Sequence, residues 1–305
     1  MRRERIIFIV GPTAIGKTRI AVKLARTLGS EIISADSMQV YKGMRLLSQA
    51  PGMAEKKAVR HHLIGMLDPR KEYNVALFIK KARFLIDSMV RRSKIPIVAG
   101  GSGLYVKGLV DGLFPSPEAD MKFRVKMAKA AEKYGDKKLH AKLSGIDPAS
   151  AALIHPNDLR RIIRSLEIYH STGRTMTELK AETKGIKDIY DIKIFGLTRP
   201  REEIYSGIDA RVEEMFRDNV VGEVRKLKKR RLSKTAGGAL GLKEISGYLE
   251  GKYDLATAKD LLKMNTRRFA KRQLTWFKGD PRIEWFDLSK MSEAKTVSRI
   301  TKEVR

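Results

Sequence analysis

The chain contains no cysteine, and aromatic residues make up only 7% of its 305 residues. The absence of cysteine excludes disulfides, thiolate zinc sites and cysteine nucleophiles, so any metal must be held by oxygen or histidine ligands. Hydrophobic runs are short and fall far below the roughly 18 to 20 apolar residues that span a bilayer. The apolar stretch near the first residue, IIFIV, is also shorter than the roughly 7 residues of a signal-peptide core, and we expect a cytoplasmic protein with no membrane segment.

Negative charge is scarce as well. The chain has 63 lysines and arginines against 35 aspartates and glutamates, a formal net charge of +28 that is spread along the sequence. Such an excess indicates a polyanionic partner, most simply a nucleic acid. An anionic membrane surface is the alternative, but the short apolar runs argue against a membrane protein.

Short apolar runs alternate with amphipathic segments through the first hundred residues, and this alternation predicts a parallel sheet. The runs predict strands at residues 6–10, 31–35, 62–67 and 95–99. Helical patterns lie between several of them, for example at residues 19–28 and 76–90.

The pattern changes after GLFPSPEAD, whose Pro115 and Pro117 interrupt any helix, and only helical periods follow until about Thr183. Strands return at residues 190–197 and in RIEWFDL, residues 282–288. We therefore predict three parts: a P-loop catalytic core at residues 1–114, a helical insertion domain at 115–190, and a return to the core with basic helices at 191–305. The predicted fold class is α/β, a P-loop NTPase-like parallel sheet flanked by helices, with an all-helical insertion.

GPTAIGKT, residues 11–18, satisfies the pattern GxxxxGK[ST] between a predicted strand and a predicted helix. Glycines let backbone N–H groups turn toward phosphates, Lys17 reaches the outer phosphate, and Thr18 can hold Mg²⁺. Such loops are typical of nucleotide-binding and ATP-binding proteins, but the pattern does not distinguish a nucleotide from another diphosphate. The loop consists of Gly11, Pro12, Thr13, Ala14, Ile15, Gly16, Lys17 and Thr18.

Asp36 follows the second predicted strand, at the sheet edge where α/β proteins bind ligands. Its carboxylate could ligate Mg²⁺, bind a ribose hydroxyl or act as a general base, or it could cap a helix together with Ser37. The amide of Gln39 is suited to reading a base edge. Asp68, after HHLIGML, is an alternative metal ligand, although Pro69 makes a plain turn at least as plausible.

A second glycine-rich loop, GGSG at residues 100–103, ends the fourth predicted strand. Hydrolases and kinases of nucleoside triphosphates often carry a metal-binding aspartate there. Its absence weakens the interpretation as an ordinary NTPase.

Two basic segments are candidates for RNA contact. In HPNDLRRIIRSLEIY, three arginines at 160, 161 and 164 share a helical face suited to phosphodiester contacts, or to solvent. NTRRFAKRQLTWFKG, residues 265–279, interleaves basic and aromatic residues, so that Trp276 could stack on an unpaired base or lie in the core. The basic run at 225–234 enlarges the positive field.

Taken in order, GPTAIGKT, ISADSMQVYKGM, AGGSGLY, IHPNDLRRIIRSLEIY, IYSGIDARVEEM, ALGLKEISGYLEG and TRRFAKRQLTWFKGDPRIEWF resemble the bacterial tRNA dimethylallyltransferases, also called tRNA isopentenyltransferases. The resemblance covers most of the chain. It implies an enzyme that transfers a dimethylallyl group from dimethylallyl diphosphate to N6 of adenine 37 in the tRNA anticodon stem-loop, with release of diphosphate and a need for Mg²⁺. We expect a monomer.

The resemblance also implies roles for single residues. The loop at 11–18 would hold the diphosphate with Lys17, Asp36 would be the general base, and Arg211 would neutralise the leaving group. Ser102 stands where the family usually has threonine and keeps a hydroxyl at that position. The residues that the resemblance places against tRNA are Asp36, Ser37, Met38, Gln39, Ser102, Arg124, Arg160, Arg161, Ile162, Ile163, Arg164, Lys271, Arg272, Gln273, Leu274, Thr275, Trp276, Phe277 and Lys278.

Two departures from the family pattern stand out: Leu242 replaces a tyrosine, which puts one tRNA contact in doubt, and Ile15 replaces a small residue. Two other functions remain as alternatives from the sequence. One is a P-loop kinase or ATPase acting on a small acceptor, and the other is a nucleotide-switched RNA-binding protein.

Overall fold

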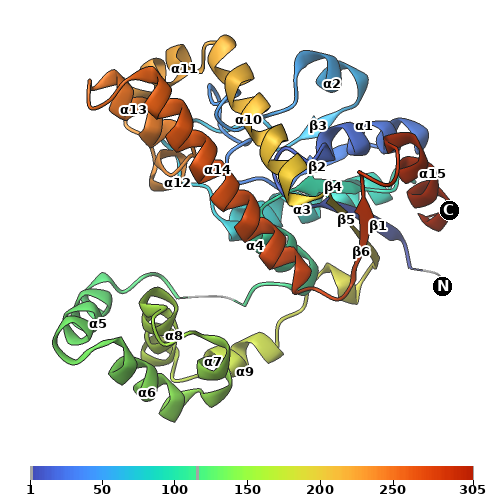
Figure 1. The fold of residues 1–305 in the computed structure, drawn as a ribbon. Coiled ribbons are helices and arrows are strands. Elements are labelled where there is room, and N and C mark those ends of the chain that lie inside the picture. The colour runs from blue at the N-terminus through green and yellow to red at the C-terminus, as the bar shows by residue number, and fades with distance from the viewer. Residues whose placement is uncertain (1–2, 115–116, 305) are drawn as a thin grey trace. The chain divides into compact units, whose positions relative to one another are not determined.

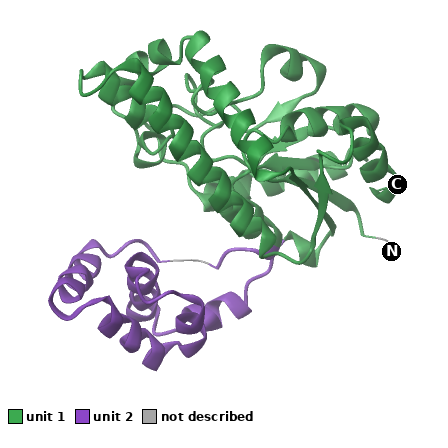
Figure 2. Ribbon diagram, in the orientation of Figure 1, with its two compact units in different colours: residues 1–110, 186–305 green, residues 111–185 purple. Residues whose placement is uncertain are grey.

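The computed structural model describes residues 3–114 and 117–304, and the chain divides into two compact units (Figure 2). Unit 1 consists of residues 1–110 and 186–305, and unit 2 of residues 111–185. Residue 115, where the sequence predicts the insertion to begin, lies outside the described residues. The return to unit 1 comes earlier than the predicted residue 191, because Ile186 is buried in its core and the Tyr190 hydroxyl donates to Asp87 Oδ1 at 2.7 Å.

Unit 1 is built on a parallel sheet, six-stranded within the described residues, so the predicted α/β fold class is confirmed (Figure 1). The strand order is β3-β2-β4-β1-β5-β6. The phosphate loop follows a central strand, with β4 on one side and β5 on the other. The strands are β1 (Arg5–Val10), β2 (Ile32–Ser34), β3 (His61–His62), β4 (Ile97–Gly100), β5 (Asp191–Thr198) and β6 (Ile283–Asp287).

The strand predicted at residues 62–67 is wrong beyond its first residue. β3 ends at His62, and only an isolated bridge joins Leu67 to Tyr41. Leu63 and Gly65 both take left-handed backbone angles, with φ of 63° and 59°, which no strand can accommodate. These residues form a turn instead, in which Gly65 N donates to the carbonyl of Gln39. The apolar run at residues 62–67 therefore does not mark a strand beyond His62.

Helices cover the sheet of unit 1, and the predicted helices at 19–28 and 76–90 correspond to α1 and α3. α1 packs on β1 and β4, and α15 packs on α1, whereas α10, α11, α13 and α14 pack against one another (Figure 1). The helices of unit 1 are α1 (Lys17–Thr27), α2 (Met53–Ala58), α3 (Val75–Val90), α4 (Gly103–Asp111), the 3₁₀ turn η1 (Ile186–Asp188), α10 (Arg201–Arg217), α11 (Val220–Lys228), α12 (Lys234–Gly237), α13 (Leu242–Leu249), α14 (Leu255–Lys278) and α15 (Glu293–Val304).

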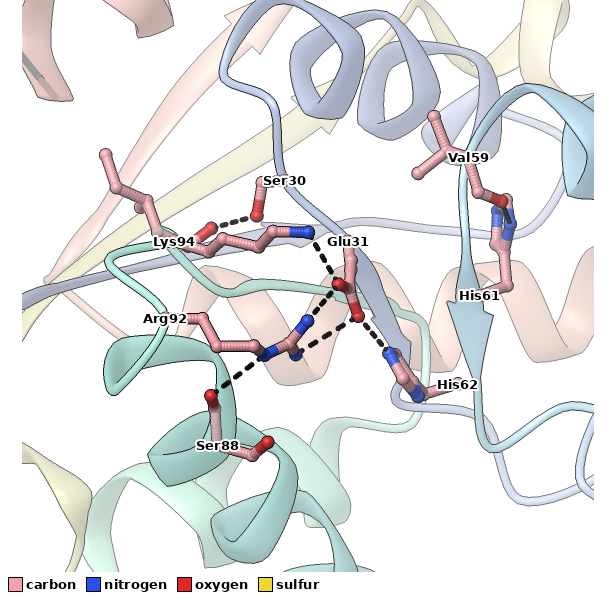
Figure 3. A network of polar contacts seen from close by, with 9 residues as sticks. Ser30, Glu31, Val59, His61, His62, Ser88, Arg92 and Lys94 are labelled. Carbon is pink, nitrogen blue, oxygen red and sulfur yellow. Dashed lines mark hydrogen bonds and ion pairs between the residues drawn. The ribbon is translucent and has the colours of Figure 1, made fainter.

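A buried carboxylate fixes the start of β2 (Figure 3). Glu31 accepts hydrogen bonds from Arg92, Lys94 and His62, each at 2.7 Å. The ion pair with Arg92 outweighs the cost of burial and holds the pKa of Glu31 well below its usual range. These contacts join β2 to β3 and to the connection between α3 and β4, so they set the position of the strand that leads to Asp36.

Unit 2 is helical throughout its described residues, as the sequence predicts. Its own small core is formed by apolar residues of α5, α6 and α8, including Met127, Leu143 and Leu166. Its helices are α5 (Met121–Tyr134), α6 (Asp136–Ile146), α7 (Pro148–Leu153), α8 (Leu159–Thr172) and α9 (Met176–Ala181).

Candidate functional site

A cavity of about 1070 Å³ opens in unit 1 at the carboxyl ends of three neighbouring strands, β2, β4 and β1. The phosphate loop, Asp36 and the second glycine loop each follow one of these strands and together line the cavity. Because parallel strands end at the same sheet edge, residues far apart in the sequence meet there. Arg211 of α10 and Gln273 of α14 complete the walls.

The phosphate loop ends in a helix whose first N–H groups have no capping side chain. Gly16 precedes α1 with φ 96°, and the first turn contains no acidic residue. By contrast, a side-chain oxygen caps each of α3, α5, α8 and α14, supplied by Asn74, Asp120, Asp158 and Asp254. An uncapped helix N-terminus favours an anion.

Glycine is required at the start of this loop. Gly11 has φ 140°, and a Cβ there would lie 2.5 Å from the carbonyl oxygen of Leu197 on β5. The loop is therefore held against the neighbouring strand. Lys17 donates to the carbonyl of Pro12 at 2.6 Å, which folds its side chain back over the loop.

Asp36 both caps a turn and faces the cavity. Its Oδ1 accepts from Met38 N at 2.8 Å and from Gln39 N at 3.2 Å, but residues 37–40 form a turn and not the helix that the capping alternative expects. Among the described residues Oδ2 has no hydrogen-bond partner, so one carboxylate oxygen remains for a ligand. Burial raises the pKa of Asp36, and the two main-chain bonds and the charge of Lys17 oppose that rise.

Two cations share the cavity with this carboxylate. Burial lowers the pKa of Lys17 to about 8, although the charge of Asp36 opposes the shift. Burial also lowers the pKa of Arg211. Both groups are poorly hydrated in the folded protein, so an anion placed between them would restore much of the stabilisation that water gives an exposed cation.

Gln273 was assigned to tRNA contact on resemblance, and the structure places it inside the protein. Its side-chain oxygen accepts from Thr13 N at 2.8 Å, and its Nε2 donates to the carbonyl of Gly101 at 2.9 Å. A Cβ on Gly101 would lie 2.2 Å from this amide. Gln273 thus joins the phosphate loop to the second glycine loop.

Ser102 and Gln39 also make contacts within the site. The Ser102 hydroxyl oxygen accepts from Ser37 N at 3.2 Å, which leaves its proton available for donation. The amide of Gln39 accepts from Ser34 Oγ at 2.8 Å and donates to the carbonyl of Gln49. No motif in the sequence marks Gln49, so its place in the site could not be predicted.

The four arginines of unit 2 that the resemblance assigns to tRNA fall into two groups. Arg124 and Arg164 both pair with the fully buried Glu167, at 2.8 Å for Arg124 Nη2. Burial opposes ionisation of Glu167, but these ion pairs outweigh it and lower its pKa. Arg160 and Arg161 are exposed instead. Arg164 of α8 and Arg124 of α5 therefore stabilise the fold of unit 2.

Ile162 and Ile163 were also assigned to tRNA contact on resemblance, and the structure gives the location of their side chains. Both are buried in the core of unit 2. The α8 sequence alternates core and surface positions with helical period, so the family segment RRIIR presents arginines while its isoleucines face inward.

The segment at 271–278 divides in the same way. Phe277 is buried in the core of unit 1, and Leu274 packs against it. Trp276 is 41% exposed and lies so close to Gly103 that a Cβ there would be 2.2 Å from its ring. Leu242, the departure from the family tyrosine, is buried. The exposed members are Lys271, Arg272, Thr275, Trp276 and Lys278.

Other candidates lie apart from the cavity walls. Asp68 pairs with Arg70 at 2.9 Å and is not among the lining residues. Within the described part of the chain, no group of three or more His, Cys, Asp or Glu side chains is arranged to hold a metal ion. Nor does that part contain a helix long and apolar enough to cross a membrane.

Comparison with known proteins fits this arrangement. A family model described as IPP transferase matches residues 39–280, and one described as isopentenyl transferase matches residues 4–72. The chain belongs to the IPP transferase family. The resemblance drawn from the sequence motifs is thereby confirmed.

The similar proteins match this IPP transferase over most of its length. A tRNA dimethylallyltransferase of Halothermothrix orenii is 46% identical over 300 residues, which are 97% of this chain and 92% of that protein. The crystal structure of a tRNA isopentenylpyrophosphate transferase from Bacillus halodurans matches with a TM-score of 0.73 at 38% identity, covering 99% and 96% of the two chains. A eukaryotic dimethylallyltransferase acting on tRNA gives a TM-score of 0.78 at 27% identity, covering 97% of this chain and 77% of that one.

Proposed function

We propose that this IPP transferase transfers a dimethylallyl group from dimethylallyl diphosphate to N6 of adenine 37 in the tRNA anticodon stem-loop, with release of diphosphate. One observation carries the proposal: the unpartnered Oδ2 of Asp36 shares a cavity with an uncapped helix N-terminus and two cations. The pairing of a base with an anion site suits a reaction in which an amine loses a proton as a diphosphate departs. The names of the similar proteins favour this reaction over the kinase, ATPase and RNA-switch alternatives.

At the donor end, the amides of residues 14–18, Lys17 and Arg211 bind the diphosphate. As the bond between the prenyl C1 and the diphosphate oxygen breaks, negative charge grows on the leaving oxygen. Preorganised amides and cations stabilise that charge, which is usually the largest contribution to catalysis. Asp36 lines the same cavity, and its negative charge repels an anion from the position where the adenine would bind.

At the acceptor end, the adenine amine is a weak nucleophile because its lone pair is delocalised into the ring. Asp36 Oδ2 accepts the N6 proton while N6 forms its bond to C1, so the proton ends on the carboxylate and the diphosphate leaves with the C–O electron pair. The raised pKa of Asp36 makes it a stronger base than an exposed aspartate. Ser37, Met38, Gln39 and Ser102 form the surrounding wall.

Mg²⁺ is part of this proposal. Mg²⁺ prefers oxygen ligands and commonly takes only one or two from the protein, with waters and substrate phosphates completing its shell. Thr18, the last residue of the phosphate loop, lines the cavity, and its hydroxyl would be the protein's ligand in such a site. When bound, the ion would neutralise charge on the diphosphate.

Adenine in a folded anticodon loop must leave its stack to reach a buried base, and exposed basic side chains suit the surrounding phosphates. We assign the contacts with tRNA to exposed side chains: Arg160 and Arg161 in unit 2, and Lys271, Trp276 and Lys278 in unit 1. We further propose that the protein is cytoplasmic, because the tRNA pool is cytoplasmic. We also propose that it is a monomer.

The test is to incubate the purified protein with labelled dimethylallyl diphosphate, Mg²⁺ and unmodified tRNA. We expect label on N6 of adenine 37, and a loss of at least about 100-fold in rate for Asp36→Asn, since general bases typically contribute that much. Asp68→Asn, which removes a half-exposed carboxylate paired with Arg70 outside the cavity walls, is the matched control and should retain the rate. Failure to label adenine would refute the reaction, and full activity of Asp36→Asn would refute its role as base.

A further inference from the structure

Residues 44–50 form a turn that has the hydrogen-bond pattern of a helix end but contains a glutamine where such turns usually place glycine. Ala50 N donates to the carbonyl of Arg45 and Gln49 N to that of Leu46, both at 3.1 Å. These two bonds are the pair that defines a Schellman motif, and Gln49 stands at its left-handed position with φ 53°.

A left-handed backbone is strained for a residue with a Cβ, because the Cβ comes close to the following carbonyl oxygen, and glycine escapes this strain. The turn is nevertheless firmly held, because the carboxylate of Glu223 on α11 accepts from Leu46 N at 3.0 Å and from Leu47 N at 2.9 Å. A strained residue kept in place by its surroundings indicates that its side chain serves the site.

The contacts of Gln49 show what the side chain does. Its Oε1 accepts from the Thr13 hydroxyl in the phosphate loop at 2.9 Å. Its main-chain carbonyl, turned inward by the left-handed backbone, accepts from Arg211 Nη2 and Gln39 Nε2, each at 3.4 Å. One residue thus contacts the loop, the cation and the turn that bears Asp36.

We propose that Gln49 is a positioning residue of the diphosphate site: its side chain orients Thr13, and its carbonyl orients Arg211. This rests on the proposed function, in that it takes the cavity to hold a diphosphate. Gln49 itself need not touch the substrate. It acts by fixing two groups that do, and its amide also lies 3.8 Å from Met215 Sδ, which limits its rotation.

Gln49→Gly separates a functional role from a structural one. Glycine relieves the backbone strain and keeps the main-chain carbonyl, but it removes the acceptor for Thr13. We expect the Kd for inorganic pyrophosphate with Mg²⁺, measured by calorimetry on the full chain, to rise about 3- to 10-fold, the range for removal of one neutral hydrogen bond. We expect the Tm to stay level or rise, whereas a merely structural role predicts that it falls.

Two further variants complete the test. Thr13→Val removes the donor of the same hydrogen bond, so the double variant Gln49→Gly/Thr13→Val should bind pyrophosphate no more weakly than the weaker single variant. Ser93→Gly is the matched control, because Ser93 is exposed, has φ 55° and ends α3 away from the cavity walls. Its Kd should equal that of the unaltered protein.

An unchanged pyrophosphate affinity in Gln49→Gly, additive effects in the double variant, or a fall in Tm parallel to the loss of affinity would each overturn the proposal. The measurement needs neither tRNA nor a prenyl donor. Failure of prenyl transfer would therefore refute the proposed function while leaving the pyrophosphate result to decide the role of Gln49.

Discussion

At the scale of single residues, the cavity collects charged groups whose protonation differs from that of surface groups. Asp36 is a stronger base and Lys17 a stronger acid than their exposed counterparts, because burial penalises the charged form of each. The two charges partly compensate each other across the cavity. The site is therefore sensitive to pH on both sides of neutrality.

The lowered pKa of Lys17 predicts how the activity depends on pH at the alkaline side. Its ammonium form, which attracts the diphosphate, predominates below a pKa of about 8 and is lost as the pH rises through that value. The kcat/KM for the prenyl donor, which reports groups of the free enzyme, should thus fall above about pH 8. In Lys17→Arg the fall near pH 8 should disappear, since guanidinium stays protonated, whatever the absolute rate. An alkaline limb that stays at the same pH in Lys17→Arg would exclude Lys17 as its origin.

At the scale of elements, the arginines of α8 have two uses, one in the fold and one, as we propose, in contact with tRNA. Arg164 of α8 holds the buried Glu167 together with Arg124 of α5, and Asp120 N also donates to that carboxylate at 2.7 Å. Arg160 and Arg161 have no buried partner among the described residues, and Arg161 pairs with the half-exposed Asp158 at 3.3 Å. The family motif alone does not distinguish these two uses.

Paired substitutions separate the two uses. Arg124→Gln should destabilise unit 2 by about 2 kcal/mol, because it leaves a buried carboxylate with one cation fewer. Arg160→Gln should leave the Tm unchanged and weaken tRNA binding. Thermal unfolding and tRNA titration on both variants check this. The assignment is wrong if Arg160→Gln unfolds at a lower temperature or if Arg124→Gln loses only tRNA affinity.

The sequence predicted the elements that carry strong local signals. The phosphate loop, its flanking strand and helix, and the position of Asp36 at the sheet edge all follow from short patterns. Residues 63–67 were mistaken for strand because Leu63 takes a left-handed angle that no apolar pattern reveals. The roles of Gln49 and Gln273 were also beyond sequence reasoning, since both depend on contacts with residues 36 or more positions away.

At the scale of the whole molecule, the chain carries a net charge of +28, so its lysines and arginines far outnumber the carboxylates that could pair with them. Some basic residues form ion pairs within the protein: Lys259 and Lys263 both pair with Glu213, each at 2.7 Å. Many others remain on the surface, including Lys271 and Lys278 near the end of α14. A surplus of this size suits counterion release from a polynucleotide.

Salt dependence tests this surplus. The logarithm of the tRNA association constant should fall linearly and steeply with the logarithm of salt concentration. Replacing Lys271 and Lys278 by glutamine should reduce the slope by about 2, one for each phosphate that is no longer neutralised. Replacing the exposed Lys295 and Lys302 of α15 removes the same charge and should leave the slope nearly unchanged. A flat salt response, or equal effects of the two pairs, would contradict RNA contact by α14.

The division of unit 1 into two chain segments has a consequence for biosynthesis. On the ribosome, the phosphate loop and Asp36 emerge early, and unit 2 is complete before β5 and β6 have been made. Arg211 and Gln273, which close the cavity from the other side, emerge only after unit 2 has been completed. A nascent chain stalled before Gln273 therefore carries the whole phosphate-loop motif but lacks the assembled site, so diphosphate binding should begin only once Gln273 has been made.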